Sequence, residues 1–469
     1  MNLLFQLAAC TTLCQGPSCE SQWPNGQVAM YRGGLTAQGS VDALGDASAV
    51  YAGTNDGGSS WSTQGVDGAL LIGQPDANRV LVLEDNPESN TLIPMASWTS
   101  SGSRFGSSLA VDRSNRDNTY ALWVGGPEWN LQTGAIWLFR NAELNQAMGL
   151  DASSTATLRL NGNSPSDRFG SEIAVCGDMT GDDLAEVAVA APWFDAVDPI
   201  LPVPSLAGAV FLLHSESLAT AEDGTSPWEI GNVYWGTLEG DGAGQALHCD
   251  TDLTGDGIPD LVIGAPWVRQ ASGRVYVIDG GALPDNGPLD QVAHRILEPP
   301  NTNAENWFGM SLVPLELFGD DASDLAVGTP GFSGGQGRVL IYRGASIATT
   351  SLPSPVYQLR GDATRDTPDH LGRWLTSGRF YGGTWDDLVV GAPDYIGPGK
   401  NDYDVGQAWI WRGEDAVSWD PVMQMPDAEV TFTGTTPFQR LGRQPEMYDI
   451  DGDGLDDLLL PNRAAANVQ

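Results

Sequence analysis

The stretch Asp252–Pro266, DLTGDGIPDLVIGAP, joins a polar loop to a short apolar run. The loop has oxygen-bearing side chains at positions 1, 3, 5 and 9, which are Asp252, Thr254, Asp256 and Asp260. Side chains that alternate along a turning backbone converge on one point, and a cluster of hard oxygen ligands favours Ca²⁺. Gly257 at position 6 permits the sharp reversal that such a loop needs. The run DLVIGAP, which Gly and Pro end, is typical of a strand buried on both faces.

The same unit recurs along the chain. Each copy has a starting pair (Phe-Gly or a related dipeptide), a loop, a buried strand that ends near Gly-x-Pro, and a strand that opens with Gly. The seven starting pairs are Leu44-Gly45, Phe105-Gly106, Phe169-Gly170, Ala243-Gly244, Phe308-Gly309, Leu371-Gly372 and Leu441-Gly442. The seventh copy ends at Leu458–Pro461 without its last strand, whereas Gly26–Gly33 looks like the last strand of the fifth copy, Gly337–Gly344. The N-terminal segment is therefore predicted to complete the seventh copy.

This arrangement predicts an all-β fold, a seven-bladed β-propeller with four-stranded blades, whose ring is closed by the N-terminal strand in the last blade. Closure removes the exposed sheet edges that all-β proteins must otherwise protect. An open solenoid would need polar caps at its two ends. A string of independent β-domains would not explain why the seventh copy is divided between the two ends of the chain. We expect residues 1–22 to be a signal segment and linker and residues 23–469 to form the propeller.

The order of Phe-Gly, Asp-rich loop and Gly-Ala-Pro resembles the FG-GAP repeats, as in the N-terminal propeller of integrin alpha subunits. The resemblance extends over about Gly26 to Pro461. It implies the propeller fold, ion loops that match the family loop, and an opposite face that engages protein partners. Because propellers have many unrelated activities, the resemblance is more specific for fold than for function.

Three of the loops keep the ligand pattern, so we expect about three structural Ca²⁺ sites on one face of the disc. The predicted ligands, with a backbone carbonyl at position 7, are Asp178, Thr180, Asp182, Leu184 and Glu186; Asp252, Thr254, Asp256, Ile258 and Asp260; and Asp449, Asp451, Asp453, Leu455 and Asp457. The fifth copy keeps only Glu316, Asp320 and Asp324. In the sixth copy Arg379, Tyr381 and Gly383 replace the first three ligands, so no ion is predicted there. The alternative is an Asx-rich turn that binds nothing.

Aromatic residues follow the Gly-x-Pro segments, on the face that should lie opposite the ion loops. They are Trp129, Trp193, Phe194, Trp267, Phe332 and Tyr395. Aromatic side chains with polar tips are good contact residues for protein or sugar partners. We expect a protein or glycan ligand on this face; the alternative is that the rings pack the blade tops around the channel.

The charge balance limits the partners. The 469 residues include 60 acidic and 22 basic side chains, which gives a net charge of −38. A field of this sign argues against nucleic acid or an anionic membrane surface and favours divalent cations or basic partners. The four histidines show no motif spacing with nucleophiles or paired carboxylates, so we name no catalytic and no cofactor-binding residue.

The start of the chain, MNLLFQLAAC, is an apolar run that ends in small residues, as processing signals do. Leu-Ala-Ala-Cys resembles the bacterial lipobox, in which Cys10 would be lipidated; another secretory signal and a chance match are the alternatives. Four cysteines then remain, an even number that suits an oxidising compartment. Cys14 and Cys19 could form a local bridge, and Cys176 could pair with Cys249 at the equivalent place of the next copy. We expect an exported monomer, either a cell-surface lipoprotein or secreted.

Three functions remain open. The first is a calcium-binding, exported binding or adhesion module for a protein or glycan ligand. The second is a secreted propeller enzyme that acts on polysaccharide or ester substrates, which would need converging acid and base groups at the channel mouth. The third is a structural component of the cell envelope.

Overall fold

The computed structural model describes most of the chain after its first 26 residues. The described ranges are 27–33, 39–42, 49–52, 62–66, 69–86, 91–113, 120–140, 148–195, 204–301, 305–362, 365, 367–397 and 403–462. The predicted lipidation site Cys10 and the possible Cys14–Cys19 bridge lie outside these residues. Among the helices of the described ranges, none has the length and apolar character needed to span a bilayer.

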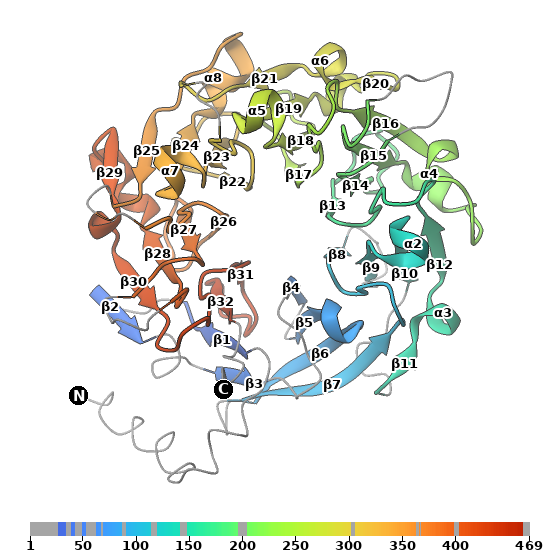
Figure 1. Cartoon of the computed structure of the whole chain (residues 1–469), viewed down its shortest axis with the longest axis horizontal. Helices are drawn as coiled ribbons and strands as arrows, with labels where there is room; N and C mark the ends of the chain where they lie inside the picture. Colours follow the sequence, from blue (N-terminus) through green and yellow to red (C-terminus); the bar gives the residue numbers. More distant parts are fainter. Residues whose placement is uncertain are drawn as a thin grey trace.

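Seven antiparallel blades surround a central axis (Figure 1), so the predicted seven-bladed β-propeller is confirmed. The first blade is β4 (Ser62–Val66), β5 (Ala69–Gln74), β6 (Arg79–Asn86) and β7 (Thr91–Thr99). The second is β8 (Leu109–Asp112), β9 (Ala121–Gly126), β10 (Ala135–Arg140) and β12 (Leu158–Asn161). The third is β13 (Ile173–Val175), β14 (Val187–Ala191), β15 (Ala209–Leu213) and β16 (Gly231–Trp235), and the fourth is β17 (Ala246–Thr251), β18 (Asp260–Ala265), β19 (Arg274–Ile278) and β21 (Arg295–Leu297).

The remaining blades follow the same order from the axis outward. The fifth is β22 (Leu312–Leu315), β23 (Asp324–Gly328), β24 (Arg338–Tyr342) and β25 (Tyr357–Arg360). The sixth is β26 (Trp374–Gly378), β27 (Asp387–Ala392), β28 (Gln407–Trp411) and β30 (Val430–Thr433). The seventh is β31 (Glu446–Tyr448), β32 (Asp457–Asn462), β1 (Gln27–Tyr31) and β3 (Ala49–Ala52).

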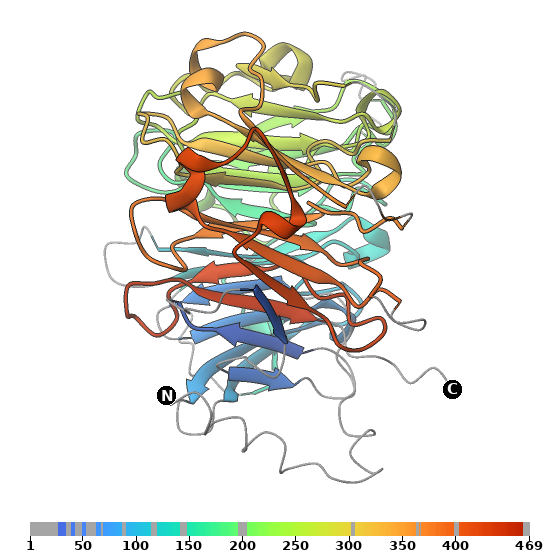
Figure 2. The same cartoon turned by 90° about the vertical axis from the view of Figure 1, so that its left-hand side faces the viewer.

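Short helices occupy the connections between strands. The α-helices are α2 (Trp129–Gln132), α3 (Ala152–Thr155), α4 (Ser215–Leu218), α5 (Val268–Ala271), α6 (Leu289–Val292), α7 (Phe332–Gly335) and α8 (Gly344–Thr349). The 3₁₀ helices are η1 (Pro75–Ala77), η2 (Pro227–Glu229), η3 (Gly280–Ala282), η4 (Gly413–Ser418) and η5 (Met425–Asp427). In side view, the described strands of neighbouring blades form a thick stack around the axis (Figure 2).

The ring closes as predicted. Strand β1 pairs antiparallel with β32, and Tyr31 lies opposite Leu458 in the register. Strand β3 then pairs with β1 and forms the outer edge of the seventh blade. The chain therefore contributes two N-terminal strands to this blade, and β3 follows Leu44-Gly45. The prediction that this pair starts the first blade was wrong, because the closure uses β3 and the first blade begins only at β4.

Within the described ranges, four blades have a fifth strand, which the four-stranded prediction did not include. The added strands are β2 (Gly39–Asp42), β11 (Leu150–Asp151), β20 (Gly287–Pro288) and β29 (Val422–Gln424). Each pairs parallel with the outer strand of one blade, and each precedes the outer strand of the next blade in the chain. The rims of neighbouring blades are therefore joined by backbone hydrogen bonds.

The core lies between the blades, because each sheet packs on a neighbour through both faces. All residues of β9, β18 and β27 are buried, which confirms the prediction of strands buried on both sides. The repeated glycines have a steric role at these contacts. A Cβ on Gly134, which opens the third strand of the second blade, would lie 2.1 Å from the carbonyl oxygen of Phe169 in the next blade.

A disulfide bond joins Cys176 to Cys249, with 4.4 Å between their Cα atoms. Cys176 follows β13 and Cys249 lies in β17, so the bond links the innermost strands of the third and fourth blades. The pairing that the sequence left open is therefore present. Both residues are buried in the core that the two blades share.

Candidate functional site

The three predicted ion loops connect the first and second strands of the third, fourth and seventh blades, and they share one hydrogen-bond pattern. In each loop the first aspartate accepts hydrogen bonds from the backbone N–H groups at positions 4, 5 and 6. Asp252 accepts from Gly255 at 2.6 Å and from Gly257 at 2.7 Å. The matching bonds end on Asp178 and Asp449 in the other loops.

Positions 5 and 7 are linked in the same way in all three loops. The fifth residue accepts a hydrogen bond of 2.9 Å from the backbone N–H at position 7; the pairs are Asp182 with Leu184, Asp256 with Ile258, and Asp453 with Leu455. In the seventh blade Asp449, Asp451 and Asp453 each bring a carboxylate oxygen within 4.8 Å of the others. Such a set of converging oxygen donors fits a hard divalent cation.

Several of the predicted ligand carboxylates already form a hydrogen bond or an ion pair with a nearby side chain. Arg32 forms an ion pair with Asp451 at 3.1 Å, which reduces the repulsion within the seventh-blade cluster. In the third blade the Ser215 hydroxyl donates to Asp182 at 2.6 Å, and the Thr180 hydroxyl donates to Glu186 at 3.1 Å. In the fourth blade the Thr254 hydroxyl contacts Asp260 at 3.3 Å.

The acid at position 9 has a structural role that the ligand pattern did not reveal. Asp260 is buried and accepts backbone hydrogen bonds from Leu253 in its own loop and from Gly280 after the third strand. Asp457 does the same with Ile450 and Gly33. Burial raises the pKa of each of these two carboxyls to about 6.

The position 9 acid is also present in the loops that lost the ligand pattern. Asp324 bridges Leu317 and Gly344 in the fifth blade, and Asp387 bridges Tyr381 and Gly413 in the sixth. This acid therefore fastens the loop to its blade whether or not the other ligand positions hold oxygen donors.

In the fifth and sixth blades an arginine contacts a carboxylate of the loop. In the fifth blade Arg343 binds both carboxylate oxygens of Asp320, and Glu316 accepts a hydrogen bond from Ser323. In the sixth blade Arg379 itself occupies position 1, with its guanidinium 3.6 Å from Asp386. One carboxylate of each of these loops, Asp320 or Asp386, thus has an arginine of the protein as its partner.

The predicted aromatic contact residues lie at the turns after the second strands, and most of them pack inward. Trp193 alone among the six is exposed, at 38%, with the Arg168 guanidinium 4.0 Å from its ring centroid. Phe194 is only 2% exposed and packs against Phe211, so it is not available to a partner. Trp129 meets Trp137 edge-on.

The other three aromatic residues are half-buried. Tyr395 meets Trp409 edge-on and lies under the Arg365 guanidinium. Phe332 lies 4.0 Å from the guanidinium of Arg338. The Trp267 ring fills the space where Gly242 has no side chain.

The residues that precede five of the seven starting pairs were not predicted from the sequence. These residues have left-handed backbone conformations and side chains that interact at the Gly-x-Pro turns; they are Arg104, Arg168, Trp307, His370 and Arg440. For example, Arg104 reaches Asp76 of the previous blade at 2.8 Å. Aligning the copies one residue upstream of Phe-Gly would have revealed this position.

A family model described as "FG-GAP repeat" matches residues 250–278, which include the fourth-blade loop and strands β18 and β19. Together with the seven repeated units, the starting pairs and the closed ring, this match decides the kind of protein. The chain is an integrin-like FG-GAP β-propeller.

The relatives of this FG-GAP propeller are longer proteins. It is 33% identical over 197 residues to phosphatidylinositol-glycan-specific phospholipase D of Homo sapiens, covering 36% of this chain and 23% of that protein. It is 33% identical over 171 residues to integrin alpha-IIb of Mus musculus, covering 35% of this chain and 15% of that protein. The match to integrin alpha-7 of Homo sapiens is 31% over 247 residues and covers 50% of this chain and 18% of that protein. The chain thus spans less than a quarter of the length of each.

Among solved structures, one titled "Crystal structure of BBS1N in complex with ARL6DN, soaked with lead" aligns with a TM-score of 0.42 and 11% sequence identity. The alignment covers 88% of this chain and 94% of that chain.

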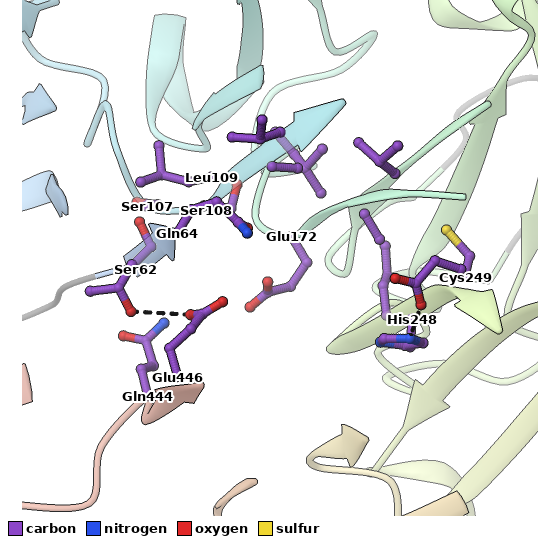
Figure 3. A pocket seen from close by; sticks show the side chains of 18 of the residues that line it. Ser62, Gln64, Ser107, Ser108, Leu109, Glu172, His248, Cys249, Gln444 and Glu446 are labelled. Atoms are coloured by element: carbon purple, nitrogen blue, oxygen red, sulfur yellow. Dashed lines mark hydrogen bonds and ion pairs between the residues drawn. The ribbon is translucent and has the colours of Figure 1, made fainter. Parts of the chain in front are cut away.

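The axis of the FG-GAP propeller contains a cavity of about 430 Å³. It is lined by residues in or next to the innermost strands of six blades, and two glutamates, Glu172 and Glu446, point into it toward one another (Figure 3). The Thr63 hydroxyl donates to Glu446 at 3.1 Å, and His248 contacts Asp250 on the far wall.

Burial raises the pKa of both channel glutamates. The pKa of Glu172 rises to about 8, with a further contribution from the charge of Glu446. The pKa of Glu446 rises to about 7, although the hydrogen bond from Thr63 opposes the change. This pair has no signature in the sequence, because Glu172 and Glu446 occupy different positions of copies that are distant along the chain.

Proposed function

We propose that the protein is a calcium-stabilised, exported binding module that contacts a protein or glycan ligand with the face opposite its ion loops. The observation that supports the calcium part most strongly is the common hydrogen-bond pattern of the three loops. Independent Asp-rich turns would have no reason to share it position by position. Because all the predicted ligands are oxygen atoms, the ion chemistry that fits them is that of Ca²⁺.

The ions would act on stability rather than on chemistry. Each loop contributes its ligands locally, and the position 9 acid connects the loop to the third strand of its blade. An ion that binds the folded loop therefore stabilises the hairpin between the first and second strands. The ligand would meet the other face, where the Gly-x-Pro turns present Trp193.

The Cys176–Cys249 disulfide supports the export part of the proposal. Disulfides form and persist in oxidising compartments outside the cytosol. The predicted lipidation at Cys10 would anchor the exported protein to a membrane, and secretion without an anchor is the alternative.

The experiment is a binding screen of the purified propeller against glycans and surface proteins, with calcium and with EDTA. A ligand whose affinity falls in the Trp193→Ala variant supports the proposed face. Glu222→Gln, an exposed substitution in the connection between β15 and β16, is the control. The proposal fails if ligands bind equally well to wild type and to Trp193→Ala, or if no ligand of either class binds.

A second candidate is hydrolysis in the central cavity, favoured by the glutamate pair. Glycoside hydrolysis uses two carboxyl groups, one of which is protonated at neutral pH through a raised pKa. Glu172 would be the acid and Glu446 the base or nucleophile. A panel of polysaccharides tests this: turnover that Glu172→Gln and Glu446→Gln both abolish supports it, and no turnover with any polysaccharide excludes glycoside hydrolysis on that panel.

A further inference from the structure

A second cavity, of about 290 Å³, lies between the sixth and seventh blades at the Gly-x-Pro turns. Its lining contains three of the chain's 22 basic residues. The lining residues are Arg373, Trp374, Pro393, Asp394, Arg440 and Arg443. In a protein with a net charge of −38, such a concentration of guanidinium groups needs an explanation.

Two of these arginines occupy the same position in neighbouring copies. Arg373 directly follows the starting pair Leu371-Gly372, and Arg443 directly follows Leu441-Gly442. The corresponding residues in the second to fifth copies are uncharged: Ser107, Ser171, Gln245 and Met310. The repeat thus places a basic side chain at this position only where it faces the cavity between these two blades.

The carboxylate in the cavity is already engaged. Asp394 accepts a hydrogen bond of 2.8 Å from His370 and lies 3.8 Å from Arg440, which also pairs with Asp404 at 2.9 Å. Burial opposes the change, but the bond from His370 and the charges of His370, Arg373 and Arg440 lower the pKa of Asp394. Asp394 therefore stays ionised and holds His370 and Arg440.

Arg373 interacts with Asp394 only through its charge and at longer range. Among the described residues it forms no ion pair within 4.0 Å and no side-chain hydrogen bond, although its side chain is half-buried. Next to it, the buried indole N–H of Trp374 also has no hydrogen-bond partner. Within the described ranges, the cavity lining therefore contains a guanidinium without a hydrogen-bond partner and, in the next residue of the chain, a buried indole N–H without one. Both are donors, so the complementary group is an acceptor with negative charge.

We propose that this cavity binds the acid group of an acidic sugar, a uronate carboxylate or a sulfate ester, within a glycan. The inference rests on the proposed binding function and names the chemistry of its ligand. A planar guanidinium binds such an oxyanion with two parallel hydrogen bonds. The cavity volume of about 290 Å³ has room for one sugar ring. The side chain of an acidic peptide would leave most of this volume empty.

The test measures binding of an oligogalacturonate and of a neutral oligogalactose of the same length by isothermal titration calorimetry, with calcium present. We expect binding of the acidic oligosaccharide only. Arg373→Gln is expected to weaken it about tenfold, and Arg373→Lys to weaken it less because the charge remains. The matched control is Arg140→Gln, an exposed arginine at the end of β10 in the second blade, which should leave the affinity unchanged. The melting temperature of each variant shows whether it is folded.

Other outcomes separate this inference from the proposed function. Inorganic sulfate should compete with the oligogalacturonate if the cavity recognises the acid group alone. Equal affinity for the neutral oligosaccharide, or no effect of Arg373→Gln in a folded variant, overturns the inference. Tighter binding of an acidic peptide than of the oligogalacturonate also overturns it, but leaves the proposed binding module standing. If neither glycans nor proteins bind the wild type, both the inference and the proposed function fail.

Discussion

Arg343 holds both carboxylate oxygens of Asp320, at 2.6 and 2.7 Å, in the loop of the fifth blade. Asp320 is the acid at position 5 of this loop, so the guanidinium brings its positive charge to a side chain that the repeat otherwise uses as an ion ligand. The propeller therefore contains two solutions to the same electrostatic problem. In the fifth blade an arginine supplies the positive charge, whereas in the seventh blade the carboxylates of Asp449, Asp451 and Asp453 converge.

The first prediction compares these two kinds of loop. EDTA is expected to lower the melting temperature of the wild type relative to calcium, because an ion that binds only the folded state stabilises it by about 2.7 kcal/mol at a concentration of 100 Kd. Asp449→Asn should reduce this difference, because it weakens one ligand set. Asp320→Asn, the matched control, should leave the difference unchanged. Scanning fluorimetry measures it, and equal melts of the wild type in calcium and EDTA contradict the prediction.

The second prediction concerns the link between the third and fourth blades. Replacing both Cys176 and Cys249 with serine is expected to destabilise the protein by roughly 4 kcal/mol, since a bond across 73 residues strongly restricts the unfolded chain. Chemical denaturation with and without a reducing agent measures the effect. Wild type that unfolds at the same denaturant concentration in both conditions would show that the bond contributes nothing.

The third prediction is a pH dependence from the channel glutamates. The pKa values of Glu172 and Glu446 in the folded protein, about 8 and about 7, lie above the ordinary value of 4.5. The folded state therefore holds more protons than the unfolded state between these limits, and stability falls as the pH rises from 4.5 toward 8. At pH 8.5, Glu172→Gln is expected to be more stable than wild type by about 1–2 kcal/mol, allowing for water in the channel.

Melting temperatures from pH 5 to pH 8.5 test this pH dependence. The variant should show a flatter profile than the wild type, and Glu222→Gln on the surface should follow the wild type. A variant profile parallel to that of the wild type would mean that the Glu172 carboxyl is fully hydrated in the channel.

The fourth prediction concerns ring closure. Tyr31 is fully buried in the seventh blade, and its ring packs on Phe432 of the sixth blade with 4.7 Å between centroids. Tyr31→Ala should cost about 3–4 kcal/mol, as large buried side chains do when truncated. Trp193→Ala, an exposed aromatic residue, should cost under 1 kcal/mol. Urea titration compares them, and similar midpoints for both variants would show that the seventh blade contributes little to stability.

The repeat made the architecture predictable. The strands that end at Gly-x-Pro, and the match between Gly26–Gly33 and Gly337–Gly344, were enough to infer a closed ring. Few other folds bury such strands on both faces and also divide one copy of the repeat between the two ends of the chain. The fifth strands were not predictable in this way. β20 contains only Gly287 and Pro288, which is too short for a hydrophobic pattern that would identify a strand. It forms a strand because the fold places it beside the outer strand of the neighbouring blade.

The candidate sites show the same division. The ion loops are local in sequence, so their spacing identified them. The other two sites depend on how the blades are arranged in the ring. Glu172 and Glu446 line the same cavity although their blades are distant along the chain. Arg373 and Arg443 line a cavity between two adjacent blades. Comparing equivalent positions across copies would have found the two arginines, since the other copies have uncharged residues there. No comparable signal exists for the two glutamates.

The antiparallel pairing of β1 with β32 has a mechanical consequence. Gln27 lies opposite Asn462, so both ends of the described chain leave the seventh blade at the same end of the strand pair. Tension applied through the two termini would therefore separate the strands one rung at a time, as in a zipper, rather than shear all their hydrogen bonds together. The seventh blade is the place where a pulled disc would open first.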